Sequence, residues 1–304
     1  MAIAIAVEHL VKTYGAVQAV KDISFTVEAG EIFGFLGPNG AGKTTTIRCM
    51  VDLIRPTSGT VAVLGHDAQA APTAIHRRIG YLPGDVRLSG NSSGKDFLQY
   101  QARLQGAQPI LLPDLVERFE IELKRPLKSY SKGMRQKIAI AQTWMCAPEL
   151  VIMDEPTSGL DPLVQQHFNA FLVEQAANGI TIFMSSHIMS DVEKICGRVA
   201  VIRAGELVAV ETVEGLRDKA GQVVIIEFAT PQPLELVQGL PGVASAEYSG
   251  VRGGGHRYTL RMHGSMDSLI KSLGQYDVIR LSASEAPLED VFMQFYQYGL
   301  GERD

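Results

Sequence analysis

The chain has 304 residues, of which 46% are hydrophobic and 20% charged, and its formal net charge is −5. This length can supply one large core or two ordinary ones, so stability requires neither disulfides nor structural metals. The acidic balance argues against a general electrostatic attraction to nucleic acid or to anionic lipid. Cys49, Cys146 and Cys196 lie far apart with no metal-ligand spacing, which favours buried free thiols in a reducing compartment.

The first 56 residues predict strands that lead to a glycine-rich loop. Short strands joined by turns are expected over residues 2–27, and the apolar run Ile32–Leu36 predicts a buried strand. The glycine-rich loop follows directly. A helix is predicted from Thr44 to Leu53, because Pro56 disfavours helix at the residue before it.

The next part of the chain, residues 86–147, has helical periodicity and predicts a helical insertion between two strands. Two apolar faces are expected in it, one of Phe97, Leu98, Tyr100 and Leu104 and one of Met134, Ile138, Ala141 and Met145.

After the insertion, strands are predicted at Leu150–Met153 and Thr181–Ser185, with a helix over Pro162–Ala177 between them. Alternating strands and helices indicate a mostly parallel sheet that is covered on both faces.

The last part of the chain predicts a second, smaller domain. Its expected order is β-α-β-β-α-β followed by a helix over Leu288–Tyr298, which is typical of a ferredoxin-like α+β fold. We therefore divide the chain into residues 1–220, with a helical subdomain at about 87–147, and an accessory domain at residues 221–304.

The apolar N-terminal stretch Met1–Leu10 is short and has no basic leader. No later stretch approaches the ~18 to 20 uncharged apolar residues that a membrane helix needs. The sequence therefore predicts a chain that does not itself cross a membrane.

The glycine-rich loop matches the pattern G-x-x-x-x-G-K-[ST] and lies between a buried strand and a helix start. Such loops turn backbone N–H groups toward phosphate oxygens, while the lysine neutralises the β- and γ-phosphates and the following hydroxyl can bind Mg²⁺. A structural glycine turn is the rarer explanation in this position. The residues expected to bind ATP here are Gly37, Pro38, Asn39, Gly40, Ala41, Gly42, Lys43, Thr44 and Thr45.

The strand at Leu150–Met153 ends in two adjacent carboxylates, Asp154 and Glu155. Like charges at the end of a buried strand are costly unless a metal or a substrate uses them. We expect Asp154 to hold Mg²⁺ through water, with Thr44 as a further ligand, and Glu155 to polarise the water that attacks the γ-phosphate. A solvated turn is the alternative.

Four further segments resemble motifs of the ABC ATPases, in the order and spacing of that family. The tract Ser131-Lys132-Gly133-Met134 resembles the signature motif, and Ser158-Gly159-Leu160-Asp161 resembles the D-loop. His187 falls at the switch histidine, and Tyr14 matches the aromatic residue that stacks on adenine. Taken singly, a packed tyrosine, a structural histidine or a helix N-cap would explain each position.

The resemblance implies an α/β ABC cassette with a mostly parallel core sheet, an antiparallel β subdomain and the helical insertion. It also implies a head-to-tail dimer that encloses two ATP molecules. Ser131 and the Gly133 amide would then touch the γ-phosphate bound by the second copy, and Asp161 would couple the two sites. Glu155 and His187 are the implied catalytic residues.

This chain departs from the family pattern at two places. Gly84, followed by Asp85, stands where the family's Q-loop usually has glutamine, and we expect Asp85 to substitute near the metal, the alternative being a weakened γ-phosphate sensor. The signature has Lys132 for the usual first glycine and Met134 for the usual glutamine, but retains the serine and the second glycine.

The form Tyr-Ser-Lys-Gly-Met-Arg-Gln at residues 130–136, with Ala286-Pro287-Leu288-Glu289-Asp290-Val291-Phe292 near the end of the chain, resembles the ATPases of daunorubicin/multidrug-resistance-type exporters. This implies a cytoplasmic subunit, peripheral at the inner face of the cell membrane, that powers a separate membrane permease. The other hypothesis is a soluble ABC ATPase acting on nucleic acid or ribosomes. We expect no nucleic-acid partner, since a solvated face explains the basic cluster at residues 124–137.

Overall fold

The structure is a computed structural model, and it describes residues 2–88 and 90–289. The chain divides into two compact units, of which the first ends at Val213 and the second begins at Glu214.

The first unit is built on a six-stranded sheet in the order β10-β9-β3-β8-β7-β6. All neighbouring strands pair in parallel except β10, which is antiparallel to β9. The carboxyl ends of β3, β7 and β8 therefore meet at one edge, which is where ligands bind in open α/β sheets. The strands are β3 (Ile32–Leu36), β6 (Ile79–Leu82), β7 (Leu150–Asp154), β8 (Thr181–Ser186), β9 (Arg198–Arg203) and β10 (Glu206–Thr212).

A second, antiparallel sheet has the order β2-β1-β4-β5. Its strands are β1 (Ile3–Tyr14), β2 (Val17–Glu28), β4 (Ser58–Val63) and β5 (His66–Asp67). Phe25 of β2 stacks on Phe33, Phe35 and Phe183 of the central sheet, with ring centroids 5.4 to 6.2 Å apart. This aromatic cluster joins the two sheets in one hydrophobic core.

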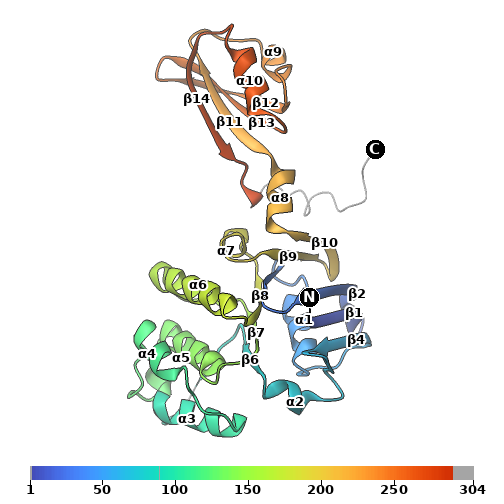
Figure 1. The fold of residues 1–304 in the computed structure, drawn as a ribbon, viewed down its shortest axis with the longest axis vertical. Helices are drawn as coiled ribbons and strands as arrows, with labels where there is room; N and C mark the ends of the chain where they lie inside the picture. Colours follow the sequence, from blue (N-terminus) through green and yellow to red (C-terminus); the bar gives the residue numbers. More distant parts are fainter. Residues whose placement is uncertain (1, 89, 290–304) are drawn as a thin grey trace. The chain divides into compact units, whose positions relative to one another are not determined.

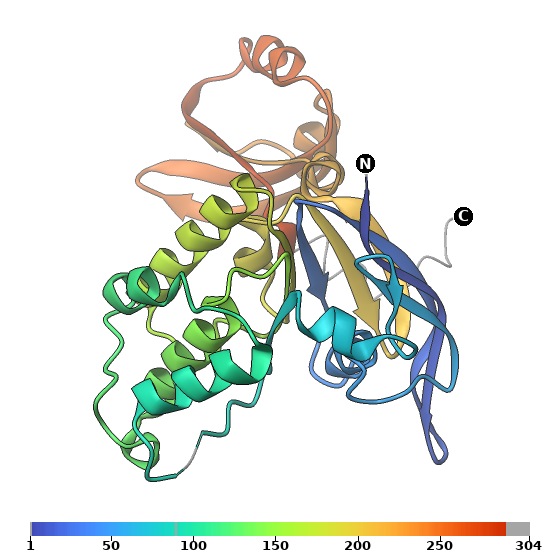
Figure 2. The ribbon, with the colours of Figure 1, turned by 60° about the horizontal axis from the view of Figure 1, so that its bottom comes forward.

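Three helices of the first unit begin at a residue whose side chain caps the helix. Ser93, Ser131 and Asp161 each accept a hydrogen bond from a backbone N–H of the first turn. Helices α3 to α5 form a group on one side of the central strands, and the antiparallel sheet lies on the other side (Figure 1, Figure 2). The helices are α1 (Lys43–Met50), α2 (Pro72–His76), α3 (Gly94–Gln105), α4 (Leu112–Arg118), a 3₁₀ turn (Leu127–Ser129), α5 (Lys132–Trp144), α6 (Pro162–Ala177) and α7 (Met189–Glu193).

The prediction of a single apolar face for the first inserted helix is wrong in part. Leu98 is fully buried, whereas Tyr100 and Leu104 are 59% and 63% exposed. Helix α3 packs through Leu98 and Ala102, four residues apart, and Tyr100 lies about 200° around the helix from Leu98. The α3 side chains that remain exposed are thus available for another contact.

The second unit contains a four-stranded antiparallel sheet in the order β12-β13-β11-β14. Its β-α-β-β-α-β order and this strand order agree with the predicted ferredoxin-like fold. The elements are β11 (Gln222–Phe228), α9 (Leu234–Gln238), β12 (Val243–Arg252), β13 (Gly255–Met262), α10 (Met266–Leu273) and β14 (Val278–Glu285); α8 (Val213–Ala220) precedes them. From position 290 onward, the predicted helix over Leu288–Tyr298 and the motif that ends at Phe292 lie outside the described residues.

Over residues 2–88 and 90–289, no helix combines the length and the apolar character that crossing a bilayer requires.

Candidate active site

The loop between β3 and α1 forms a cradle at the sheet edge. Gly40 and Gly42 have φ angles of 81° and 111°, a backbone conformation that glycine adopts without strain. Helix α1 follows with no side-chain cap at Gly42, so the N–H groups of its first turn can serve an anion. The cradle opens into a cavity of about 260 Å³. Its lining is Ala19, Pro38, Asn39, Gly40, Gly42, Lys43, Thr44, Thr45 and Glu155.

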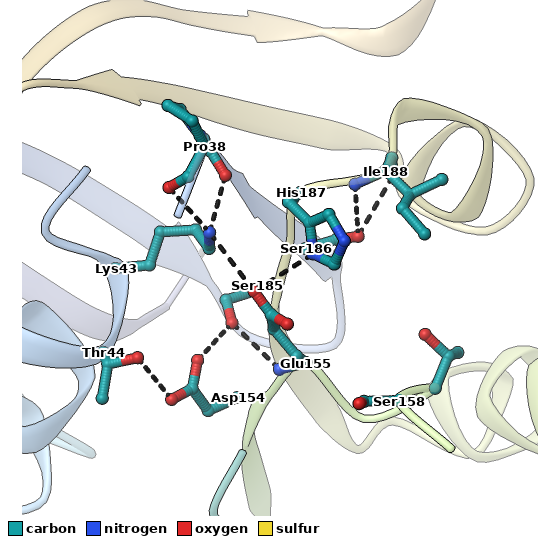
Figure 3. Close-up of polar contacts among 12 residues, drawn as sticks. Pro38, Lys43, Thr44, Asp154, Glu155, Ser158, Ser185, Ser186, His187 and Ile188 are labelled. Carbon is teal, nitrogen blue, oxygen red and sulfur yellow. Dashed lines mark hydrogen bonds and ion pairs between the residues drawn. The ribbon is translucent and has the colours of Figure 1, made fainter. Parts of the chain in front are cut away.

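Lys43 is 95% buried, and its ammonium lies against this loop. Its Nζ donates to the carbonyl oxygens of Gly37 and Pro38 at 2.6 and 3.1 Å, and lies 3.4 Å from Glu155 Oε1 (Figure 3). A buried ammonium needs such oxygen partners. The phosphate oxygens of a nucleotide are equally suitable partners for it.

Asp154 is the last residue of β7 and lies beside the first turn of α1. Its carboxylate accepts from Thr44 Oγ1 at 2.7 Å and from Ser185 Oγ at 2.6 Å (Figure 3). Within the described part of the chain, no group of three or more His, Cys, Asp or Glu side chains is placed to hold a metal. The hydroxyl and carboxylate of this pair nevertheless fit Mg²⁺, which prefers oxygen ligands and commonly takes one or two protein carboxylates with phosphates and waters.

Glu155 lies between two nitrogen groups. His187 Nδ1 is 3.2 Å from Glu155 Oε1, the same oxygen that faces the Lys43 ammonium (Figure 3). Glu155 has a left-handed backbone with φ 48°, and its N–H donates to Ser185 Oγ at 3.0 Å. This turn directs the carboxylate into the cavity, where it is placed to accept a proton from water.

The loop after β6 brings Gly84 against Asp154. A Cβ atom at Gly84 would lie 3.2 Å from Asp154 Oδ2, so a side chain here would press on that carboxylate. The Asp85 carboxylate instead pairs with Arg87 at 2.7 Å, and its side chain is 71% exposed. The loop therefore approaches the site through backbone, while the assignment of Asp85 to the metal stays a prediction.

The signature segment begins helix α5, with Ser131 as its N-cap and Lys132 at its first residue. Met134 donates its N–H to Ser131 Oγ, and Gly133 is half-buried. Asp161 has the same capping role for α6. Among the described residues, no hydrogen bond or ion pair joins positions 131–134 to positions 37–45 of the same chain.

Tyr14 lies at the end of β1, where its side chain is 46% exposed. The Lys12 ammonium is 5.0 Å above its ring. Of the described residues, Ala19 of the neighbouring strand lines the cavity, and Tyr14 does not. Stacking of Tyr14 on adenine therefore remains an expectation.

Sequence reasoning missed Ser185, which bridges the two carboxylate residues of the site. Its register partner in the parallel pair β7–β8 is Asp154, so the contact is set by strand pairing. The signal was a pair of serines, Ser185 and Ser186, at the end of an apolar strand just before His187.

We predict that Gly37→Ala weakens ATP binding roughly tenfold or more, because a Cβ there would lie 2.4 Å from the Ile202 carbonyl oxygen and the loop would have to shift. Gly197→Ala is the matched control, since nothing lies within 4 Å of a Cβ at that position. Titration of both variants with a fluorescent ATP analogue, alongside thermal unfolding, checks this. Equal affinities in the two variants would contradict it.

Comparison with known proteins agrees with this arrangement. Residues 20–158 match the family model described as ABC transporter. The chain is 39% identical over 207 residues to the ABC transporter ATP-binding protein NatA of Bacillus subtilis, covering 66% of this chain and 84% of NatA.

Two relatives named for drug resistance or transport are also similar. The daunorubicin/doxorubicin resistance ATP-binding protein DrrA of Streptomyces peucetius is 34% identical, covering 73% of this chain and 69% of DrrA. The bacitracin transport ATP-binding protein BcrA of Bacillus licheniformis is 32% identical over 301 residues, covering 94% of both chains. The likeness to BcrA thus includes the second unit.

A solved structure of an ATP-binding subunit of an ABC transporter superposes with a TM-score of 0.67 at 30% identity, covering 71% of this chain and 92% of that one. The fold, the sequence relatives and the residues at the sheet edge lead to one conclusion. This chain belongs to the ABC transporter family and is an ATP-binding, ATP-hydrolysing subunit of that family.

Proposed function

We propose that this subunit powers the export of a small molecule, drug-like or other, through a separate transmembrane permease. The names of DrrA and BcrA concern daunorubicin/doxorubicin resistance and bacitracin transport, and this supports an export role. The observation that carries the proposal is the divided site: Lys43 and Glu155 line one cavity, while among the described residues no hydrogen bond or ion pair joins positions 131–134 to the glycine-rich loop.

In the proposed reaction, water attacks the γ-phosphorus of ATP and breaks its bond to the bridging oxygen, which gives ADP and phosphate. Glu155 orients this water and accepts its proton, and His187 holds the Glu155 carboxylate in place. The Lys43 ammonium and the N–H groups of the loop stabilise the charge on the phosphates. Thr44 and Asp154 would hold Mg²⁺, which would supply electrostatic stabilisation of the charge that develops on the phosphates.

A second copy of the chain completes each site in this proposal. Ser131 and the Gly133 amide stand at the start of α5, where helix N–H groups favour a phosphate. They would contact the γ-phosphate bound by the other copy, and Asp161 would couple the two sites. Residues 221–304, most of the second unit, are proposed to form an accessory domain.

The permease is proposed to dock in a groove of about 210 Å³ beside the helical group. Leu53, on its rim, is 57% exposed, and Gln105 has a buried side-chain oxygen with no hydrogen-bond partner. An apolar side chain and an unpaired acceptor suit a partner segment that brings apolar residues and one donor. The groove is lined by Val51, Leu53, His76, Ile79, Tyr81, Gln105, Gln142 and Thr143.

This groove is close to the catalytic carboxylates through β6. Tyr81 lies in the groove lining, and burial together with the negative charge of Asp154 raises the pKa of its phenol. Gly84, three residues further on, contacts Asp154. A partner that binds in the groove can therefore displace the Asp154 carboxylate through β6 and the loop that follows it.

We predict that Leu53→Asp releases the subunit from the membrane fraction of host cells and leaves the ATPase activity of the purified subunit within about twofold, since surface substitutions away from a site change little. Ile110→Asp is the control, because Ile110 is equally apolar, 68% exposed, and outside the groove. The proposal of a membrane partner fails if the wild-type subunit sediments with ribosomes or DNA instead.

A further inference from the structure

Lys132 stands where the family usually has a glycine, and its side chain reaches another part of the same chain. Its Nζ lies 3.4 Å from Ser158 Oγ. Its aliphatic stem covers Gly159: a Cβ atom there would lie 2.8 Å from Lys132 Cε and 3.0 Å from Cδ. The lysine therefore bridges the signature segment and the turn at residues 158–161.

Two further contacts hold the same elements together. Gln136, one turn along α5, is buried and donates from Nε2 to the Pro156 carbonyl oxygen at 2.8 Å. Gly133 approaches Gly159 so closely that a Cβ on it would lie 3.3 Å from the Gly159 carbonyl oxygen. The start of α5 and the turn after β7 thus form one packed unit.

The segment that connects β7 to this turn also includes Glu155, the base of the proposed reaction. Ser158 donates its N–H to the Glu155 carbonyl oxygen at 3.1 Å, which closes the turn that places Glu155 in its left-handed conformation. On the other side, Thr157 Oγ1 donates to Asp191 Oδ2 at 3.0 Å. A displacement of α5 at Lys132 would therefore reach the backbone of Glu155 through Ser158.

We infer that Lys132 is a positioning residue that links the signature segment of one subunit to Glu155 of the same subunit. The inference rests on the proposed function, in which the signature touches the ATP bound by the other copy while Glu155 acts on the ATP in its own loop. Lys132 then transmits occupancy of one site to the catalytic carboxylate of the other. A glycine at this position could make neither the contact with Ser158 nor the cover over Gly159.

The test compares variants of the full-length chain. Lys132→Gly removes the whole bridge, Lys132→Met removes only the ammonium, and Lys132→Arg keeps a cation on a long stem. We expect Lys132→Gly to lower kcat about tenfold, since small displacements of catalytic groups are costly. The Hill coefficient for ATP should fall toward one, with affinity for ATP within about twofold and the thermal midpoint little changed. Lys132→Arg should restore most of the turnover.

A double-mutant cycle isolates the contact itself. If Lys132 acts through Ser158, the Lys132→Met/Ser158→Ala variant loses no more activity than the stronger single variant. Additive losses, or a Lys132→Gly variant with wild-type kcat and Hill coefficient, would overturn the inference.

If the proposed function is wrong, Gly133→Asp leaves turnover intact, whatever the effect of the Lys132 substitutions. If Gly133→Asp abolishes turnover and Lys132→Gly does not change it, only the link assigned to Lys132 is wrong.

Discussion

Glu155→Gln should lose at least about 99% of ATP turnover while it still binds ATP, because a positioned general base contributes roughly 100-fold or more to such reactions. The amide nearly matches the carboxylate in shape but cannot accept the proton. It also removes the negative charge 3.4 Å from the Lys43 ammonium, so ATP affinity should stay equal or rise. Phosphate release and equilibrium ATP binding, measured on one preparation, test both halves.

Glu117→Gln provides the control for this prediction. It makes the same chemical change at an exposed position on α4, and its turnover should match the wild type. With MgATP, the Glu155→Gln variant should also accumulate as a dimer in size-exclusion chromatography. Normal hydrolysis by Glu155→Gln would remove Glu155 from the role of base.

Gly133→Asp should also abolish turnover, to below about one hundredth of the wild-type rate, because a carboxylate at the start of α5 would repel the triphosphate and block its N–H groups. Among the described residues, no hydrogen bond or ion pair joins Gly133 to the glycine-rich loop of its own chain, so ATP binding by the single subunit should persist. The measurement is ATP binding beside phosphate release.

A matched substitution elsewhere separates this effect from that of an added negative charge alone. Gln108→Asp adds one negative charge at an exposed position of the helical group and should leave turnover unchanged. If Gly133→Asp lost ATP binding by the monomer, the assignment of this segment to the second copy would be wrong.

The sequence predicted what depends on local patterning. The glycine-rich loop, the strand before it and the carboxylates after β7 follow from short tracts whose geometry is set by glycine and by apolar runs. The N-caps at Ser131 and Asp161 are equally local. These tracts predicted the fold class and, apart from Ala19, the residues that line the cavity.

Contacts between distant strands and turns were not predictable in this way. Ser185 meets Asp154 because β7 and β8 pair in one register, and no spacing within either segment specifies it. The bridge from Lys132 to Ser158 spans 26 residues and depends on how α5 packs on the turn. The exposure of Tyr100 and Leu104 likewise reflects which face of α3 meets α5.

The glycine-rich loop defines half of a site, and the claim that a second copy supplies the other half can be tested by mixing two inactive variants. In a mixed dimer of Glu155→Gln and Gly133→Asp, one site carries both defects and the other carries neither. Random pairing makes half of the dimers mixed, and each mixed dimer has one intact site of two, so turnover should return to at most about one quarter of the wild-type rate. A mixture that stays inactive, although mixed dimers are shown to form, would contradict the account.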